Sequence, residues 1–127
     1  PKMSSSSVAG RATVLDLAPN DVVATTQTET GVDLQPYEGS MICVLDAEAG
    51  GGSVTYAVKL QDSADNSTFG DLSGAAFTTT TANTALVEKL VVDIDNCKRY
   101  VRAVIIVAGG SGTGAVSVKA LAFPKYG

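Results

Sequence analysis

The chain contains no histidine and no tryptophan, and both absences narrow the functions that it can have. Without histidine, the sequence lacks the usual general base of hydrolytic enzymes and the commonest metal ligand in proteins. No serine or cysteine nucleophile therefore has a visible base, and nothing in the sequence points to a hydrolase built on paired carboxylates. We predict that the protein is not an enzyme and that it binds no metal and no cofactor.

Basic residues are also scarce, with nine lysines and arginines against thirteen acidic residues and a formal net charge of -4. A basic stripe for phosphate backbones is missing, so nucleic acid is not expected as a partner. No apolar run approaches the roughly 20 residues that a membrane-spanning helix needs, so no membrane partner is expected. The first seven residues lack the apolar region of a secretory signal, which favours synthesis in a reducing cytosol.

What the sequence does contain is typical of one all-β domain. Its 127 residues are 45% hydrophobic, which is enough for a single core. Runs rich in Val, Thr and Ile are separated by Gly, Asn and Asp turns, and seven or eight such strands predict an antiparallel β-sandwich or jelly-roll-like fold. Cys43 and Cys97 fall in or beside expected strands, and we interpret them as small core residues before a disulfide. The expected strands include residues 22–28, 41–47, 54–61, 76–81 and 86–94.

The C-terminal stretch from Arg99 to Phe123 is the strongest β signal in the chain. Two runs rich in Val and Ile flank the glycine-rich segment 109–114, which can form a loop at little steric cost. We interpret the stretch as one long antiparallel hairpin. Its first strand is apolar on both faces from Ala103 onward, which indicates a central strand covered on both sides. Its second strand alternates and should point one set of side chains inward: Val116, Val118, Ala120 and Ala122.

Residues 1–20 differ from the rest of the chain, because four serines precede a segment with no aromatic residue and no clear period. One interpretation is a frayed terminus. The other is an extended arm that becomes ordered on a neighbouring subunit, and the apolar residues of the segment favour it. We therefore divide the chain into an extended N-terminal arm, residues 1–20, and a β-sandwich domain, residues 21–127. The expected partner contacts of the arm are Val8, Arg11, Val14, Leu15 and Leu17.

Two groups of polar residues have both a functional and a structural interpretation. The oxygen ligands between Asp62 and Asp71 could hold calcium, but their spacing lacks the register of a calcium loop, and a solvated β-turn explains them better. Arg99 and Arg102 are expected to form cross-strand ion pairs with Asp93 and Asp95. Because Arg102 lies among apolar neighbours, it is also a candidate contact residue for a partner.

Two segments resemble small structural proteins of tailed bacteriophages. They are VKLQDSADNSTF, residues 58–69, and DIDNCKRYVRAV, residues 93–104. The resemblance implies a capsid decoration (cement) protein of the β-sandwich or jelly-roll type, which is often a trimer and often carries terminal arms. It implies the major capsid protein as the partner, and a place on the capsid surface of the virion after synthesis in the host cytoplasm. No binding residues transfer with the resemblance.

The expected function is therefore to bind the outside of a phage capsid and to stabilise it by bridging neighbouring capsid subunits. Such bridging gains its strength from several simultaneous contacts rather than from one strong contact. Another head-completion or tail structural protein of the phage remains an alternative. A carbohydrate-binding module is a weaker alternative, because such modules usually display exposed Trp or Tyr as stacking platforms.

Overall fold

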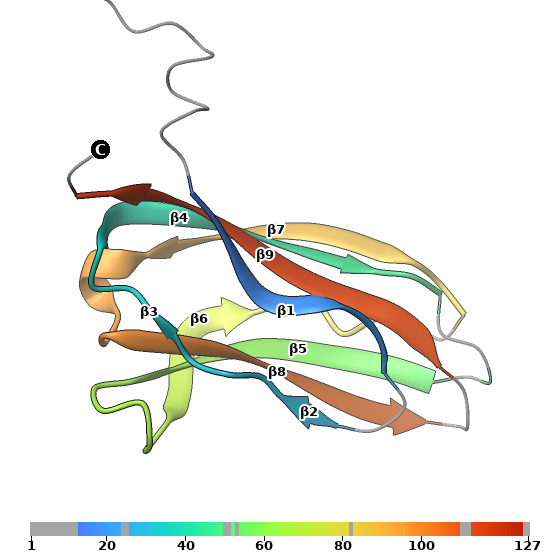
Figure 1. Ribbon diagram of the computed structural model, residues 1–127. Coiled ribbons are helices and arrows are strands. Elements are labelled where there is room, and N and C mark those ends of the chain that lie inside the picture. Colours follow the sequence, from blue (N-terminus) through green and yellow to red (C-terminus); the bar gives the residue numbers. More distant parts are fainter. Residues whose placement is uncertain are drawn as a thin grey trace, which may run out of the picture.

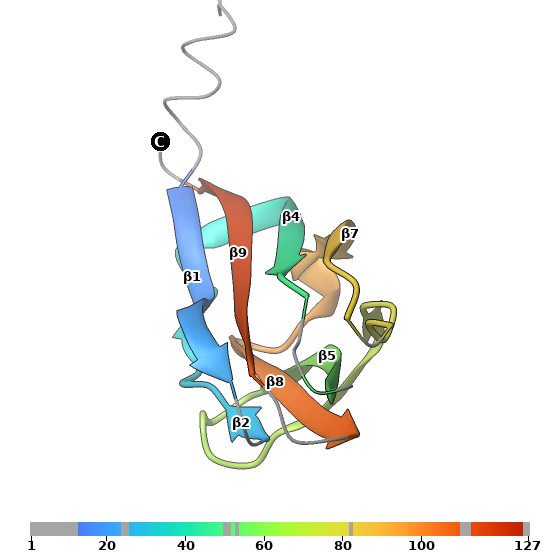
Figure 2. The same ribbon diagram turned by 90° about the vertical axis from the view of Figure 1, so that its right-hand side faces the viewer.

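The computed structural model describes residues 13–23, 26–49, 52, 54–81, 83–109 and 113–125, and within them the chain is a sandwich of two antiparallel sheets (Figure 1). The first sheet contains, in spatial order, β1 (Thr13–Val23), β9 (Gly114–Pro124), β4 (Tyr37–Ala47) and β7 (Leu86–Asp93). The second sheet contains β2 (Gln27–Thr28), β8 (Tyr100–Gly109), β5 (Val54–Ser63) and β6 (Gly70–Ala76), and β3 (Val32–Asp33) also pairs with β8. Figure 2 shows the two layers from one end of the molecule.

The strand order is that of a jelly roll. If β2 and β3 count as one interrupted strand beside β8, the chain has eight strands, four in each sheet. Every connection between successive strands crosses from one sheet to the other, except the hairpin that joins β5 to β6. This winding is how double-sheet jelly rolls combine their two Greek keys. The prediction of an all-β, antiparallel, jelly-roll-like sandwich is confirmed.

The prediction of a C-terminal hairpin is wrong, because β8 and β9 lie in different sheets. β9 pairs with β1 on one side and with β4 on the other, whereas β8 pairs with β5, β2 and β3. The glycine-rich segment therefore leads from one sheet to the other. Local alternation cannot distinguish these arrangements, since two strands can meet either side by side in one sheet or face to face across the core. The central position of β8 and the inward face of β9 are both as expected.

Residues 13–20 belong to the sandwich rather than to an arm. They form most of β1, whose register with β9 places Leu15 opposite Ala120. The side chains of Leu15 and Leu17 are only 7% and 1% exposed and lie in the core. The boundary expected after residue 20 therefore moves to a position before Thr13. Residues 1–12 lie outside the described residues.

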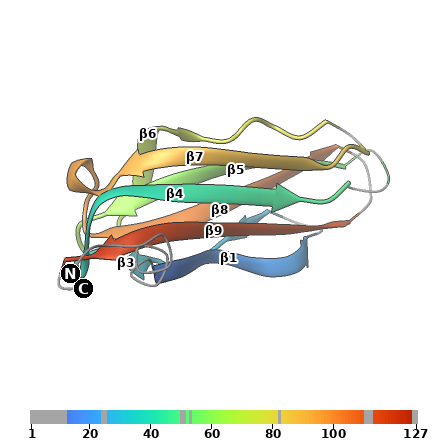
Figure 3. The ribbon, with the colours of Figure 1, turned by 90° about the horizontal axis from the view of Figure 1, so that it is seen from above.

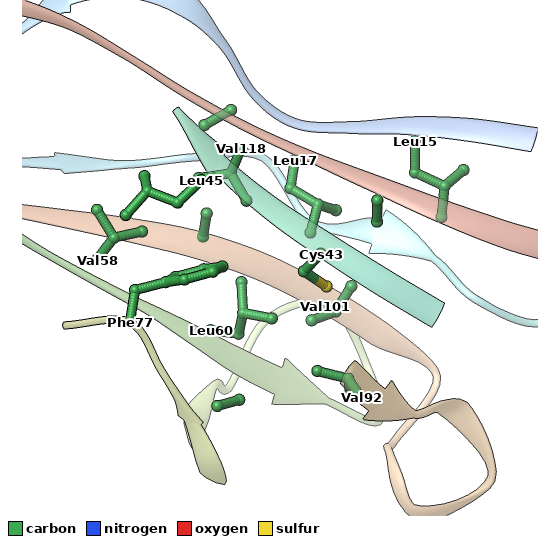
Figure 4. Close-up of a cluster of buried hydrophobic side chains, with 14 of the residues drawn as sticks. Leu15, Leu17, Cys43, Leu45, Val58, Leu60, Phe77, Val92, Val101 and Val118 are labelled. Atoms are coloured by element: carbon green, nitrogen blue, oxygen red, sulfur yellow. The ribbon is translucent and has the colours of Figure 1, made fainter. Parts of the chain in front are cut away.

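The core lies between the two sheets and is built from alternate residues of the long strands (Figure 4). β5 is the clearest example, because its four alternate residues Val54, Tyr56, Val58 and Leu60 are all buried. Tyr56 donates its hydroxyl to the carbonyl oxygen of Gly114 at 3.4 Å, and this bond gives its polar end a buried partner. Its backbone N–H donates to Thr80 Oγ1 at 2.8 Å.

The threonine-rich run expected as a strand over residues 76–81 is irregular. β6 ends at Ala76, and among the described residues that follow, Phe77 N donates to Val58 O and Thr80 N donates to Tyr56 O of β5. Phe77 and Thr80 are the buried residues of this run, and their spacing of three does not fit the two-residue repeat of a strand.

Both cysteines are free thiols. Cys43 on β4 is buried in the core, as expected, and Cys97 is half-buried just after the short 3₁₀ helix η2 (Ile94–Asn96). Among the described residues, none of the helical segments is long and apolar enough to cross a membrane.

Candidate interaction surfaces

The outer face of the first sheet carries a line of exposed apolar side chains that crosses all four strands. Val14 on β1 is in register with Leu121 on β9, Leu121 with Ile42 on β4, and Ile42 with Val91 on β7. Figure 3 shows these strands side by side in this order. The four side chains are 61%, 39%, 38% and 62% exposed, in the order given. We call Val14, Leu121, Ile42 and Val91 the apolar row.

Single exposed apolar residues are common on protein surfaces and need no explanation. The apolar row differs because its members are neighbours in register, and because Val87 and Phe123 add further exposed apolar surface on the same face. A contiguous apolar patch bordered by polar residues is typical of a site that contacts another molecule.

The register positions next to the apolar row carry opposite net charge on its two sides. On one side, the next register positions hold Asp16, Lys119, Val44 and Lys89, and Lys119 Nζ lies 3.0 Å from Asp16 Oδ1. Two lysines and one aspartate give these positions a net charge of +1, and the exposed Asp46 lies at the next outward position of β4. The other side holds Phe123 opposite Glu38 and Ser40 opposite Asp93, so that its net charge is -2.

The outer face of the second sheet is polar around Arg102. Arg102 donates from Nε to Gln61 Oε1 at 2.9 Å, and Gln61 donates from Nε2 to Asp71 Oδ1 at 2.9 Å. Lys59 Nζ lies 3.0 Å from Asp71 Oδ1, and the hydrogen bonds from Gln61 and Lys59 lower the pKa of Asp71. The ring of Phe69 lies 3.9 Å from the Arg102 guanidinium carbon, a cation–π geometry.

The ion pairs expected for the two arginines are not those that form. Arg102 binds Gln61 rather than Asp93 or Asp95, and Arg99 pairs with Asp33. Asp93 instead caps η2, where its side chain accepts from the backbone N–H of Asp95 at 3.1 Å. The expectation was wrong because it placed partners by their distance along the chain, whereas the sheet brings β3 and β5 beside β8.

The carboxylates between residues 62 and 71 serve separate structural roles. Asp62 accepts from the backbone N–H of Lys98 at 3.0 Å, and Asp71 belongs to the Arg102 face. Asp65 closes the turn by accepting from Ser63 Oγ and from the backbone N–H groups of Ser67 and Thr68, and these bonds lower its pKa to about 2. Within the described part of the chain, no three His, Cys, Asp or Glu side chains are grouped so that they could hold a metal ion.

Among the described side chains, the two cysteine thiols are the most nucleophilic kind of group, and their surroundings lower their reactivity. Burial raises the pKa of Cys43 to about 12, and burial together with the charges of Asp62 and Asp93 raises the pKa of Cys97 to about 11. The thiolate is the reactive form of cysteine, so both groups are weak nucleophiles near neutral pH.

The residues expected to contact a partner are thus dispersed. Val14 is exposed in the apolar row, Leu15 and Leu17 fill the chain's own core, and Arg102 is held by Gln61 and Phe69. Val8 and Arg11 lie outside the described residues. The sequence reasoning missed the other three members of the apolar row. The signal was present in the segment 86–94, where Val87 and Val91 make the strand apolar on its second face as well.

Comparisons with known proteins identify a fold rather than a family. No family model matches the chain, and no curated protein matches its sequence. Among solved structures, a chain of the T13 viral particle of infectious bursal disease virus (IBDV) superposes with a TM-score of 0.63 at 12% identity, covering 90% of this chain and 31% of that one. The VP2 subviral particle of the same virus gives a TM-score of 0.56 at 13% identity, over 90% of this chain and 32% of that one.

A third solved structure is similar in length. YomS, a protein derived from the SPBc2 prophage, superposes with a TM-score of 0.55 at 15% identity, and the match covers 87% of this chain and 91% of YomS. Against the IBDV proteins, by contrast, the chain spans about a third of the length. At these identities the likeness shows a shared fold.

Proposed function

We propose that this protein is a structural component of a virion, located at the capsid. The observation that carries the proposal is the structural likeness to a chain of a viral particle, which extends over 90% of this protein. The likeness to a prophage-derived protein of similar length, and the resemblance of residues 58–69 and 93–104 to tailed-phage structural proteins, point in the same direction.

In finer detail, the protein binds the outside of the capsid and stabilises it by bridging neighbouring copies of the major capsid protein. A stiff two-sheet body suits this role, since a bridge must transmit strain between the subunits that it joins. The residues proposed to reach a capsid subunit are those before β1, with Val8 as the apolar contact and Arg11 as the charged one. The trimeric state that the phage resemblance implies stays a prediction.

No catalytic activity is part of this proposal. The described thiols have raised pKa values, and the described carboxylates between residues 62 and 71 are engaged in turn and sheet contacts. A broad hydrolase screen that detects turnover, abolished by substitution of one carboxylate, would contradict this part of the proposal.

Co-sedimentation with heads tests the proposed capsid function. Heads that lack the protein are prepared from the virus that encodes it, mixed with increasing amounts of the purified chain, pelleted and quantified on gels. We expect saturation at hundreds of copies per head. Saturation near a dozen copies would favour the alternative of a head-completion or tail protein, and absence of binding would overturn the capsid role.

The matched variants for this experiment are a deletion of residues 1–12 and Arg102→Ala. The deletion leaves β1 intact and removes Val8 and Arg11, so we expect it to weaken binding to the heads. Arg102 is held within its own sheet by Gln61 and Phe69, so Arg102→Ala is expected to change head binding much less. Full binding by the deletion variant would remove these twelve residues from the contact.

A further inference from the structure

We propose that the apolar row is the contact face of a symmetric dimer, in which a second copy of this chain packs its own first sheet face to face on this one. The two-fold axis runs parallel to the apolar row, across the strands. Each member of the row then faces the same residue of the second copy. This contact differs from the trimer that the phage resemblance implies.

The charges beside the row are compatible with this axis. Rotation about an axis parallel to the row exchanges its two sides, so the lysine-bearing side of one copy lies over the acidic side of the other. Lys89 then faces Asp93 of the second copy on the same strand, and Lys119 faces Phe123 of the second copy, which lies beside Glu38. An axis parallel to the strands would instead bring Lys89 over Asp16 of the second copy, which is also a favourable pairing, so cross-linking is needed to distinguish the two axes.

The face is large enough for a dimer contact. The β4–β7 ladder runs over eight register pairs, from Ser40 to Ala47, and the sheet is four strands wide. With strands about 4.8 Å apart and a rise of about 3.3 Å per residue, the face measures about 500 Å² in each copy. Two such faces bury about 1,000 Å², which is near the lower limit for a specific protein interface. The contact between the two copies would then resemble the face-to-face packing of the two sheets within each copy.

The dimer would explain how a single small domain bridges capsid subunits, and this consequence rests on the proposed function. In a two-fold dimer each copy presents its own capsid-binding surface, and the two surfaces are held at a fixed separation. Binding of the first copy then raises the effective concentration of the second at the neighbouring subunit, which strengthens attachment without a new kind of contact.

Sedimentation equilibrium of the purified full chain, over a concentration series and without capsids, tests the dimer. We expect a monomer–dimer equilibrium that Ile42→Lys shifts to monomer, with the dissociation constant raised at least tenfold. The matched control is Ile106→Lys, which places the same charge on the other sheet at a side chain that is 37% exposed, compared with 38% for Ile42. The control should keep the dissociation constant of the natural chain.

Folding of each variant is checked by circular dichroism. If Ile42→Lys does not fold, Val91→Lys on the edge strand β7 provides the same test at a side chain that is 62% exposed. A monomer at every concentration, a trimer, or a dimer unaffected by these substitutions would each overturn the proposal.

Disulfide trapping tests the direction of the axis. In a Cys97→Ser background, Ile42→Cys lies on the axis and should cross-link to itself under mild oxidation, whereas Val44→Cys should not, because it faces the region of Ser40 of the second copy. Efficient trapping of Val44→Cys, with or without trapping of Ile42→Cys, would contradict this axis. The capsid role is tested separately, since failure of head binding leaves a dimer in solution untouched.

Discussion

Arg99 holds Asp33 in a forked geometry, with Nη2 2.9 Å from Oδ2 and Nε 3.1 Å from Oδ1. The pair fastens β3 to the start of β8, and Asp33 Oδ1 also accepts from the backbone N–H of Gln35 at 2.9 Å. Two parallel bonds make this a geometrically specific contact between residues that are far apart in the sequence. The hydrogen bond from Arg99, followed by that from Gln35, lowers the pKa of Asp33 below its ordinary value of 3.8.

Asp33→Asn should therefore remove a pH-dependent part of the stability. Because the folded pKa lies below 3.8, the contribution of Asp33 is fully present above that pH and is lost as the pH falls through the lowered folded value. Both side chains are partly exposed, so we expect a small effect. Urea unfolding from pH 7 to pH 2 checks this. The free energy of unfolding of the natural chain should exceed that of the variant at pH 7, and the difference should shrink toward pH 2. A difference that stays constant over this range would contradict the pairing of Asp33 with Arg99.

Asp65 is expected to titrate near pH 2. Its carboxylate accepts from Ser63, Ser67 and Thr68, and protonation breaks those bonds. The contribution of Asp65 to stability is thus complete above pH 3.8 and disappears as the pH falls through about 2. An NMR titration of the carboxyl carbon measures the midpoint directly. Asp65→Ala should also speed amide exchange at Ser67 and Thr68, whereas Asp71→Ala should not, and a midpoint at or above 3.8 would refute the turn assignment.

Thr80→Val should destabilise the sandwich by about 1–3 kcal/mol, because it leaves the buried N–H of Tyr56 without its acceptor. Thr80→Ser keeps the hydroxyl and is the matched control, which should recover most of this loss. Denaturant unfolding of the three proteins gives the comparison. If the valine and serine variants were equally stable, the hydroxyl of Thr80 would not be the group that matters.

Leu17→Ala should cost about 2–5 kcal/mol, since the side chain is 1% exposed and its removal leaves a cavity between the sheets. Asp16→Ala, on the outer face of the same strand, removes an exposed ion pair with Lys119 and should cost about 0–1 kcal/mol.

Deletion of residues 1–12 should leave the free energy of unfolding nearly unchanged. Deletion of residues 1–18 removes more than half of β1 and should unfold the domain, so a stable fold after that deletion would show that β1 is dispensable.

The two thiols should react slowly with iodoacetamide at pH 8, and more slowly than a free cysteine peptide. Their raised pKa values, about 11 for Cys97 and about 12 for Cys43, leave little thiolate at that pH. Cys97 is half-buried and should be modified before the buried Cys43. Mass spectrometry of timed samples gives both rates. Rapid modification of Cys43 in the folded protein would contradict its place in the core.

Much of the fold was readable from residue alternation. Val54 to Leu60 and Val116 to Ala122 point alternate side chains inward as the sequence indicates, because a strand has a fixed two-residue repeat whatever its neighbours are. The class of fold follows from such local rules. Part of the exposed apolar face was visible in the same way, through Val87 and Val91 on β7.

The sequence by itself determined that this chain forms strands, which faces of them are apolar and which chemistries are missing. The tertiary structure alone decided which strands are neighbours. The glycine-rich segment permits a hairpin or a crossing between sheets equally well, and only the places of β1 and β4 beside β9 select the crossing. The same selection brings Asp33 to Arg99 and aligns Val14, Leu121, Ile42 and Val91. Strand pairing joins residues far apart in the chain, and its energy depends on the whole packed core rather than on any local segment.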